Sequence, residues 1–236
     1  MSPERLRIGD VISDAVEVYR RFFVRLVTTA AAAFLFLDLV GALSAATLSD
    51  SWTNWVAWSL VAVVVGLVGS FWIAGALVLA VDDVSDGKAD LSIRDVFDRV
   101  RPQLLALVVA GILAALGIAF GLLLLIVPGL YLLVRWSMVA PVIVLERLDA
   151  GASFSRSAVL VRGHGWRIFW LLVVVGLLAG LAHGALLGIF DFLPVFWRTW
   201  IGGTIADSLV VPFVAACVTV LYRRLAGRAG ALASHA

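Results

Sequence analysis

Charged residues and cysteine are both scarce in this chain. Of its 236 residues, 14% are Asp, Glu, Lys or Arg, and Cys217 is the single cysteine. One cysteine excludes a disulfide framework and the paired Cys spacing of a zinc site. With 63% hydrophobic residues and a mean hydropathy of +1.07, the chain has more apolar surface than a water-soluble core could bury. We therefore expect the lipid bilayer to surround most of it.

The common catalytic motifs are also missing. The sequence contains no His-Glu-x-x-His, no Gly-x-Ser-x-Gly, no phosphate-binding glycine loop and no clustered carboxylates. His164, in the segment RGHGW, lies between two apolar runs, where contact with solvent or headgroups is the simplest expectation. We therefore predict that the protein is not an enzyme, and the sequence offers no catalytic, cofactor-binding or metal-binding residue.

Six long apolar runs separate the charged segments. A helix needs ~20 apolar residues to cross a hydrocarbon core of ~30 Å, and five of the six runs reach that length. The runs predict membrane-spanning helices at residues 24–48, 55–81, 104–127, 130–145, 168–190 and 201–222. The expected fold class is an all-α integral membrane protein, with residues 1–236 forming a single membrane domain.

The fourth run is short and contains Pro141, which removes a backbone hydrogen bond. This helix is therefore expected to be kinked or to cross only part of the bilayer. Pro128-Gly129 is the expected turn between the third and fourth helices. Because apolar residues flank that turn, it should be covered by protein or lie within the outer leaflet.

Positive charges gather in alternate gaps between the runs. Sixteen of the 18 Lys and Arg lie before or at the very start of the first run, or after the second, fourth or sixth, whereas Arg198 lies in a remaining gap and Arg135 lies well inside a run. The positive-inside rule predicts that both termini are cytoplasmic. Anionic headgroups attract such charges, so membrane lipids are the expected partners and nucleic acid is not.

Three segments in the positively charged gaps have the spacing of amphipathic helices. Residues 8–23 place apolar side chains at helical intervals, and residues 91–101 repeat the pattern after Ser92, which has capping-box spacing to Asp95. Residues 150–167 form a less regular third segment. We interpret them as helices that lie along the cytoplasmic interface, and as the first elements of three repeats, each an interfacial helix and a transmembrane hairpin.

Four ionisable residues lie within the apolar runs and are the candidate functional residues. They are Asp38, Arg135, His183 and Asp207. Counting 1.5 Å per residue places the two Asp and the His ~20 Å from the cytoplasmic helix ends and Arg135 ~15 Å, so they could share one polar layer. Because an isolated charge at this depth is costly, we expect Arg135 to pair with Asp207, Asp38 or both. Such a layer could be a buried ion pair that fixes helix register, or a cavity for a lipid headgroup, a solute or a proton.

A glycine recurs every four residues in the fifth run. The stripe consists of Gly176, Gly180, Gly184 and Gly188. Small residues at this spacing let two helix backbones approach closely. Packing within the bundle is the simplest interpretation, and contact with another copy or a pore lining are the alternatives.

Four segments together resemble the bacterial membrane-domain family named after glycerophosphoryl diester phosphodiesterase. They are LRIGDVISDAVEVYRRFF, PGLYLLVRWSMVAPVIVLE, GASFSRSAVLVRGHGWRIFWLLV and VPFVAACVTVLYRRL, which together extend over nearly the whole chain. The resemblance implies a six-helix plasma-membrane protein with an interfacial N-terminal helix and no assigned activity. The His-Arg-Gly and Glu-x-Thr elements of the phosphodiesterase are missing, so the family name does not imply that activity here. Relatives often have Tyr-x-Asp-Leu-Arg where this chain has Tyr222, Arg223, Arg224 and Leu225.

We expect a non-enzymatic multi-pass protein of the bacterial plasma membrane that organises lipid or partner proteins, with a partner membrane protein or a second copy as its contact. Seventeen Arg against one Lys, with abundant Ala, Gly and Val, also favours a bacterial source. The alternative is a small transporter or channel that uses the polar layer. A lipid enzyme embedded in the membrane is the third class, but the chain lacks a recognisable nucleophile or metal set for it.

Overall fold

The computed structural model describes residues 7–46, 52–85 and 90–233, and within these ranges the chain forms helices and short connections without any strand. Six helical stretches are long and apolar enough to cross a membrane. The prediction of an all-helical, multi-pass membrane protein is confirmed at this level. The elements are α1 (Ile8–Arg21), α2 (Phe23–Ala46), α3 (Trp52–Ser85), α4 (Ile93–Val100), α5 (Leu104–Leu124), α6 (Ile126–Arg135), α7 (Val139–Glu146), α8 (Ala150–Val161), α9 (Gly165–Ile189), α10 (Val195–Trp197), a π-helical turn (Arg198–Gly202) and α11 (Gly203–Ala233).

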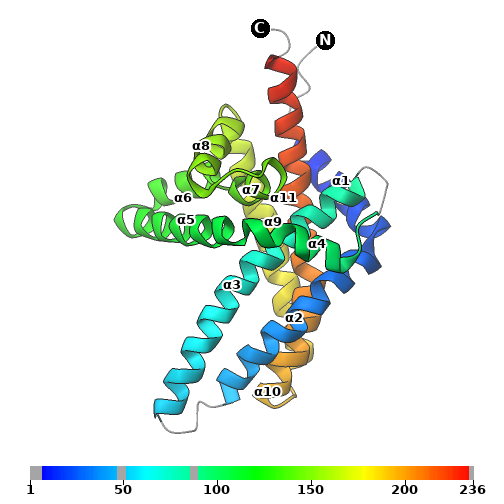
Figure 1. Ribbon diagram of the computed structural model, residues 1–236, viewed down its shortest axis with the longest axis vertical. Coiled ribbons are helices and arrows are strands. Elements are labelled where there is room, and N and C mark those ends of the chain that lie inside the picture. Colours follow the sequence, from blue (N-terminus) through cyan, green and yellow to red (C-terminus); the bar gives the residue numbers. More distant parts are fainter. Residues whose placement is uncertain (1–6, 47–51, 86–89, 234–236) are drawn as a thin grey trace.

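The long helices α2, α3, α9 and α11 extend toward one end of the molecule, and the N- and C-terminal ends of the chain lie at the other (Figure 1). The connection at α10 lies at the end far from the termini. The α5–α6 hairpin is different, because it extends sideways, crosswise to α2 and α3 (Figure 1). Length and hydropathy therefore identify α5 as a possible membrane span, but they do not show its direction.

The fourth predicted helix, residues 130–145, is divided in two. α6 ends at Arg135 and α7 begins at Val139. The hydroxyl of the buried Ser157 bridges the break, since it donates to the Arg135 backbone oxygen at 2.8 Å and accepts from the Met138 N–H at 3.2 Å. Pro141 is in the first turn of α7, where a missing N–H is tolerated. The break thus precedes the proline instead of occurring at it.

The turn between α5 and α6 also differs from the prediction. Leu125 is the single non-helical residue between them, and Pro128-Gly129 belongs to the first turns of α6. A Cβ added to Gly129 would lie 2.6 Å from the backbone nitrogen of Leu122, so only glycine lets the two helices come this close. This hairpin is tight because of Gly129, and its outer surface is strongly apolar, with Leu123 83% exposed.

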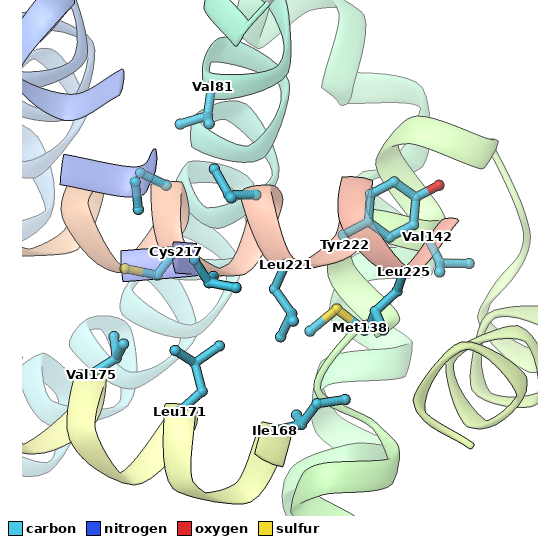
Figure 2. Packing of buried hydrophobic residues seen from close by; sticks show 14 of the residues in the cluster. Val81, Met138, Val142, Ile168, Leu171, Val175, Cys217, Leu221, Tyr222 and Leu225 are labelled. Atoms are coloured by element: carbon cyan, nitrogen blue, oxygen red, sulfur yellow. The ribbon is translucent and has the colours of Figure 1, made fainter. Parts of the chain in front are cut away.

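The core is organised around α11, the most buried of the candidate spans. Leu221 and Leu225 of α11 pack among side chains from α7, α9 and the α6–α7 connection (Figure 2). The labelled neighbours include Met138, Val142, Ile168, Leu171 and Val175. Cys217 is also in this cluster and is buried. Because lipid is as apolar as these side chains, dense van der Waals packing is the main attraction that holds them together.

Two of the three amphipathic segments form short helices that pack on this core. α1 covers residues 8–21 of the predicted 8–23, and Val11 is fully buried. α4 covers 93–100 of the predicted 91–101, and the capping box between Ser92 and Asp95 is confirmed. The third segment, 150–167, is divided into α8 and the start of α9, with a connection at residues 162–164.

Candidate polar site between α2, α9 and α11

Three of the four predicted polar residues line one cavity of about 560 Å³. Asp38 comes from the middle of α2, His183 from α9 and Asp207 from the first turns of α11. The structure thus brings these three residues together at one cavity. The lining residues are Asp38, His183, Gly184, Leu187, Gly188, Asp191, Arg198, Thr199, Gly203 and Asp207.

Of the three predicted residues, His183 and Asp207 contact each other directly. Nε2 of His183 lies 3.2 Å from Oδ1 of Asp207, and the side chains are 35% and 25% exposed. At this distance the imidazole and the carboxyl group can form a hydrogen bond. The pair links α9 to α11 on the wall of the cavity.

Asp38 lines the same cavity as this pair. Its Oδ2 is buried, and no described residue donates to it. Thr204 is close enough to interact with the Asp38 carboxyl, yet no hydrogen bond of acceptable geometry joins them. The hydroxyl of Ser208, one turn further along α11, is likewise buried and without a partner in the described part of the chain. Since buried polar atoms normally have partners, these oxygens are available to a bound group or to water.

Two glycines and a π-helical turn shape this end of α11. Gly203 lies beside Asp38 of α2, and a Cβ added to it would be 3.4 Å from Cγ of Asp38. Gly202 lies against Phe190, and a Cβ added to Gly202 would lie 3.1 Å from Cβ of Phe190. Residues Arg198–Gly202 are wound as a π-helix, a local widening that is frequent at functional sites.

The mouth of the cavity is marked by Asp191 and Arg198. Nη1 of Arg198 donates to Oδ1 of Asp191 at 2.6 Å, and the side chains are 40% and 73% exposed. This pair follows α9 and precedes α11, at the end of the molecule that is far from the termini. The more exposed pair at the mouth and the less exposed His183–Asp207 pair give the cavity an outer and an inner part.

The lining carries more negative than positive groups. Three aspartates line it together with one arginine and one histidine. Among the described residues, no group of three or more His, Cys, Asp or Glu side chains could hold a metal ion.

Arg135 does not belong to this site, and the prediction that it pairs with Asp207 or Asp38 is wrong. Its guanidinium is exposed and donates to the Tyr131 hydroxyl at 2.7 Å. It lines a separate cavity between α6, α8 and α9. The depth count failed because α6 is a short helix of the sideways hairpin, so its residues do not rise along the direction of α2, α9 and α11.

The glycine stripe of α9 does not pack within the bundle, so the simplest interpretation from the sequence is wrong. Gly176, Gly180, Gly184 and Gly188 are exposed, and a Cβ on any of them would meet nothing within 4 Å. Gly184 and Gly188 line the polar cavity, where their small size leaves room.

The sequence analysis missed the polar residues near Asp38, His183 and Asp207. Thr204 and Ser208 lie on one face of α11 with Asp207, at helical intervals of three and four residues. This spacing of polar residues in an apolar run was a signal that could have identified them. Asp191 and Arg198 are seven residues apart and join through the connection at α10, which no helical spacing predicts.

No family model, no curated protein and no solved structure matches the chain. The resemblance to the glycerophosphoryl diester phosphodiesterase membrane-domain family therefore stays a prediction.

Proposed function

We propose that this protein is a non-enzymatic membrane protein that binds a small organic cation in the polar cavity, as a transporter does. The observation that carries the proposal is the buried Oδ2 of Asp38, which has no partner among the described residues, in a cavity lined by three aspartates, one arginine and one histidine. An ammonium group could donate hydrogen bonds to the Asp38 carboxylate and to the nearby hydroxyl oxygen of Thr204. It would thereby satisfy buried oxygens that otherwise lose hydrogen-bond energy.

The packing beyond the cavity supports transport by alternating access. Toward the termini, α9 and α11 continue into the buried cluster that contains Val175, Leu171 and Cys217 (Figure 2). The cavity has its exposed pair, Asp191 and Arg198, at the opposite end. Under this proposal the cavity is open toward the side of Asp191 and Arg198. Release of the cation on the other side then requires α9 and α11 to separate.

Thermal unfolding of the purified protein with a set of organic cations tests the proposal. Methylammonium, putrescine and tetramethylammonium chlorides are compared with sodium chloride at equal ionic strength. A ligand at 100 times its Kd stabilises the folded state by ~2.7 kcal/mol, and the melting temperature rises accordingly. The Asp38→Asn variant should lose this response, whereas Asp98→Asn, at an exposed acid of α4, should keep it. An equal response of the native chain to all four salts would contradict the proposal.

We further propose that α1, α4 and α8 lie at the cytoplasmic face of a bacterial plasma membrane, with both termini in the cytoplasm. The charge distribution supports this orientation, as does the position of α1, α8 and the last turns of α11 in the same half of the molecule (Figure 1). The three-repeat interpretation is supported by α1 and α4, in which Val11 and Val96 occupy the same place in IGDVI and IRDVF and are both buried.

Cysteine labelling tests this orientation. In a Cys217→Ser background, a single cysteine at Asn54 should react with an impermeant maleimide from outside intact cells, and one at Asp149 should react only after lysis. The opposite pattern would reverse the orientation. Lys88, in the second positive gap, lies outside the described residues, so Asp149 is the better reporter.

A second candidate function is the organisation of partner proteins or lipid, and the exposed face of α9 favours it. Its most apolar window is 6% buried, the lowest value among the candidate spans. The glycine stripe there would let a second copy or another membrane protein approach closely. Gly180→Leu should then abolish a dimer seen by crosslinking in native membranes, whereas Leu178→Ala on the same helix should not.

A further inference from the structure

A second cavity, of about 630 Å³, lies between α6, α8 and α9 on a different part of the molecule. α6 contributes Val127, Leu130, Tyr131, Val134 and Arg135, and the rest comes from the end of α8, the residues that follow it and the start of α9. The cavity is therefore formed where the sideways hairpin meets the α8–α9 connection. None of its lining residues belongs to the polar site described above.

Two arginines provide the charge in this cavity. Arg135 is exposed and donates to the Tyr131 hydroxyl at 2.7 Å, with its guanidinium carbon 5.8 Å from the centre of the Tyr131 ring. Arg162, also exposed, follows α8 and precedes Gly163, whose φ of +81° turns the chain toward α9. Neither guanidinium has an ion pair with any residue in the described ranges. The cavity thus carries two positive charges and no acid among its lining residues.

The remaining walls are apolar and continue into the lipid-facing surface. Trp166 is 71% exposed, and its ring stacks on Phe169 with centroids 5.5 Å apart. Val127, at the start of α6, also lines the cavity and is 75% exposed. A ligand that fills this cavity needs an anionic end for the arginines and a long apolar part for Trp166 and α6. Tryptophan at such a position is typical of the boundary between headgroups and acyl chains.

We propose that this cavity is a binding site for one anionic phospholipid, with its phosphate between Arg135 and Arg162 and an acyl chain along Val127, Leu130 and Trp166. Charge complementarity selects the headgroup, since a guanidinium binds phosphate oxygens through paired N–H donors. The orientation proposed above places Arg162 on the cytoplasmic side, and the lipid site depends on that orientation for its access to the inner leaflet. It does not depend on cation binding in the polar cavity.

Native mass spectrometry of the full chain, released from detergent with added lipid, tests the site. Dioleoyl-phosphatidylglycerol and dioleoyl-phosphatidylcholine have the same acyl chains and differ in headgroup charge. The native protein should retain one phosphatidylglycerol in preference to phosphatidylcholine. Because an arginine near anionic lipid contributes roughly a fivefold preference, Arg135→Gln with Arg162→Gln should lower the preference about 25-fold.

Matched variants separate the site from overall charge and from folding. Arg94→Gln with Arg99→Gln makes the same change in net charge on α4, where both side chains are exposed, and should leave the preference unchanged. Arg135→Lys with Arg162→Lys keeps the charge and should retain most of the preference. All variants should keep the melting temperature of the native chain, because the four arginines are on the surface.

Three results would overturn the proposal. The first is a glutamine double variant that prefers phosphatidylglycerol as strongly as the native chain does. The second is an equal loss of preference in the α4 control, which would assign the effect to overall charge. The third is displacement of the lipid by inorganic phosphate or glycerol phosphate at millimolar concentration, which would make the site one for a free anion. A melting response to organic cations is measured separately, so its failure would leave the lipid result unaffected.

Discussion

The hydroxyl oxygen of Tyr19 lies 2.8 Å from the backbone oxygen of Leu209, so a hydrogen bond joins the first helix of the chain to the last. Leu209 precedes Pro212, which has no N–H and whose ring disturbs the preceding turn of α11. Tyr19 therefore supplies a donor close to the place where the helix lacks one. Burial raises the pKa of the Tyr19 hydroxyl, so it stays a donor at neutral pH.

Tyr19→Phe should lower the free energy of unfolding by about 1 kcal/mol, because the ring remains and only the hydrogen bond is lost. Unfolding in mixed micelles with increasing SDS measures the change. Tyr131→Phe is the matched control, since Tyr131 is 59% exposed and its loss should change the stability by less than about 0.5 kcal/mol. Equal effects of the two substitutions would contradict a structural role for the Tyr19 bond.

Asp83→Asn should cost about 3 kcal/mol of stability. Oδ2 of Asp83 lies 2.7 Å from Nη2 of Arg25, with the side chains 13% and 19% exposed, and the pair joins α2 to the end of α3. Removing one partner leaves a charge with little solvent around it, and replacing both Arg25 and Asp83 by Leu should recover much of the loss.

The exposed pair Arg94–Asp98 is the control for this measurement. Its atoms are 3.7 Å apart and the side chains are 91% and 61% exposed. Asp98→Asn should therefore change the stability by less than about 0.5 kcal/mol. A double Leu variant of Arg25 and Asp83 that is no more stable than Asp83→Asn would show that the two residues do not act as a pair.

Gly180→Ala and Gly129→Ala should have opposite effects on the melting temperature. A Cβ at Gly180 meets nothing, so alanine should stabilise α9 by roughly 0.5–1 kcal/mol through helix propensity. A Cβ at Gly129 would lie 2.6 Å from the backbone nitrogen of Leu122, and the forced shift should cost about 1–3 kcal/mol. Thermal unfolding of the two variants and the native chain shows whether each substitution raises or lowers the melting temperature. A lower melting temperature for Gly180→Ala in the monomer would mean that α9 is packed after all.

Ser157→Ala should destabilise the protein more than Arg135→Leu does. Ser157 is fully buried, and its loss leaves the Arg135 backbone oxygen and the Met138 N–H without their partner, at a cost of about 1–3 kcal/mol. The Arg135 side chain is exposed, so replacing it should cost less than about 0.5 kcal/mol. Chemical unfolding measures both, and a larger effect of Arg135→Leu would restore the idea of a buried charge pair.

Hydropathy and helical spacing predicted the long helices and three of the four polar residues. Both depend on local properties, because a run of ~20 apolar residues in lipid must satisfy its own backbone hydrogen bonds as a helix. Asp38, His183 and Asp207 line one cavity, and α2, α9 and α11 continue without a break through those positions.

The division of the fourth helix and the direction of the α5–α6 hairpin could not be predicted in the same way. The break after Arg135 is held by Ser157, 22 residues further along the chain, and no local pattern marks that contact. The tight turn depends on Gly129 lying against Leu122 of the preceding helix. Arg135 was misplaced because its position depends on both of these contacts between elements.

The sideways hairpin makes the two ends of the molecule unequal in cross-section. The half that holds the termini contains α5 and α6 beside the long helices, whereas the far end consists of the tips of α2, α3 and α9 with α10 (Figure 1). When the long helices stand along the membrane normal, such a body displaces more area from one leaflet than from the other. A hairpin that stood upright beside α2 and α3 would make the two ends of the molecule more nearly equal in cross-section.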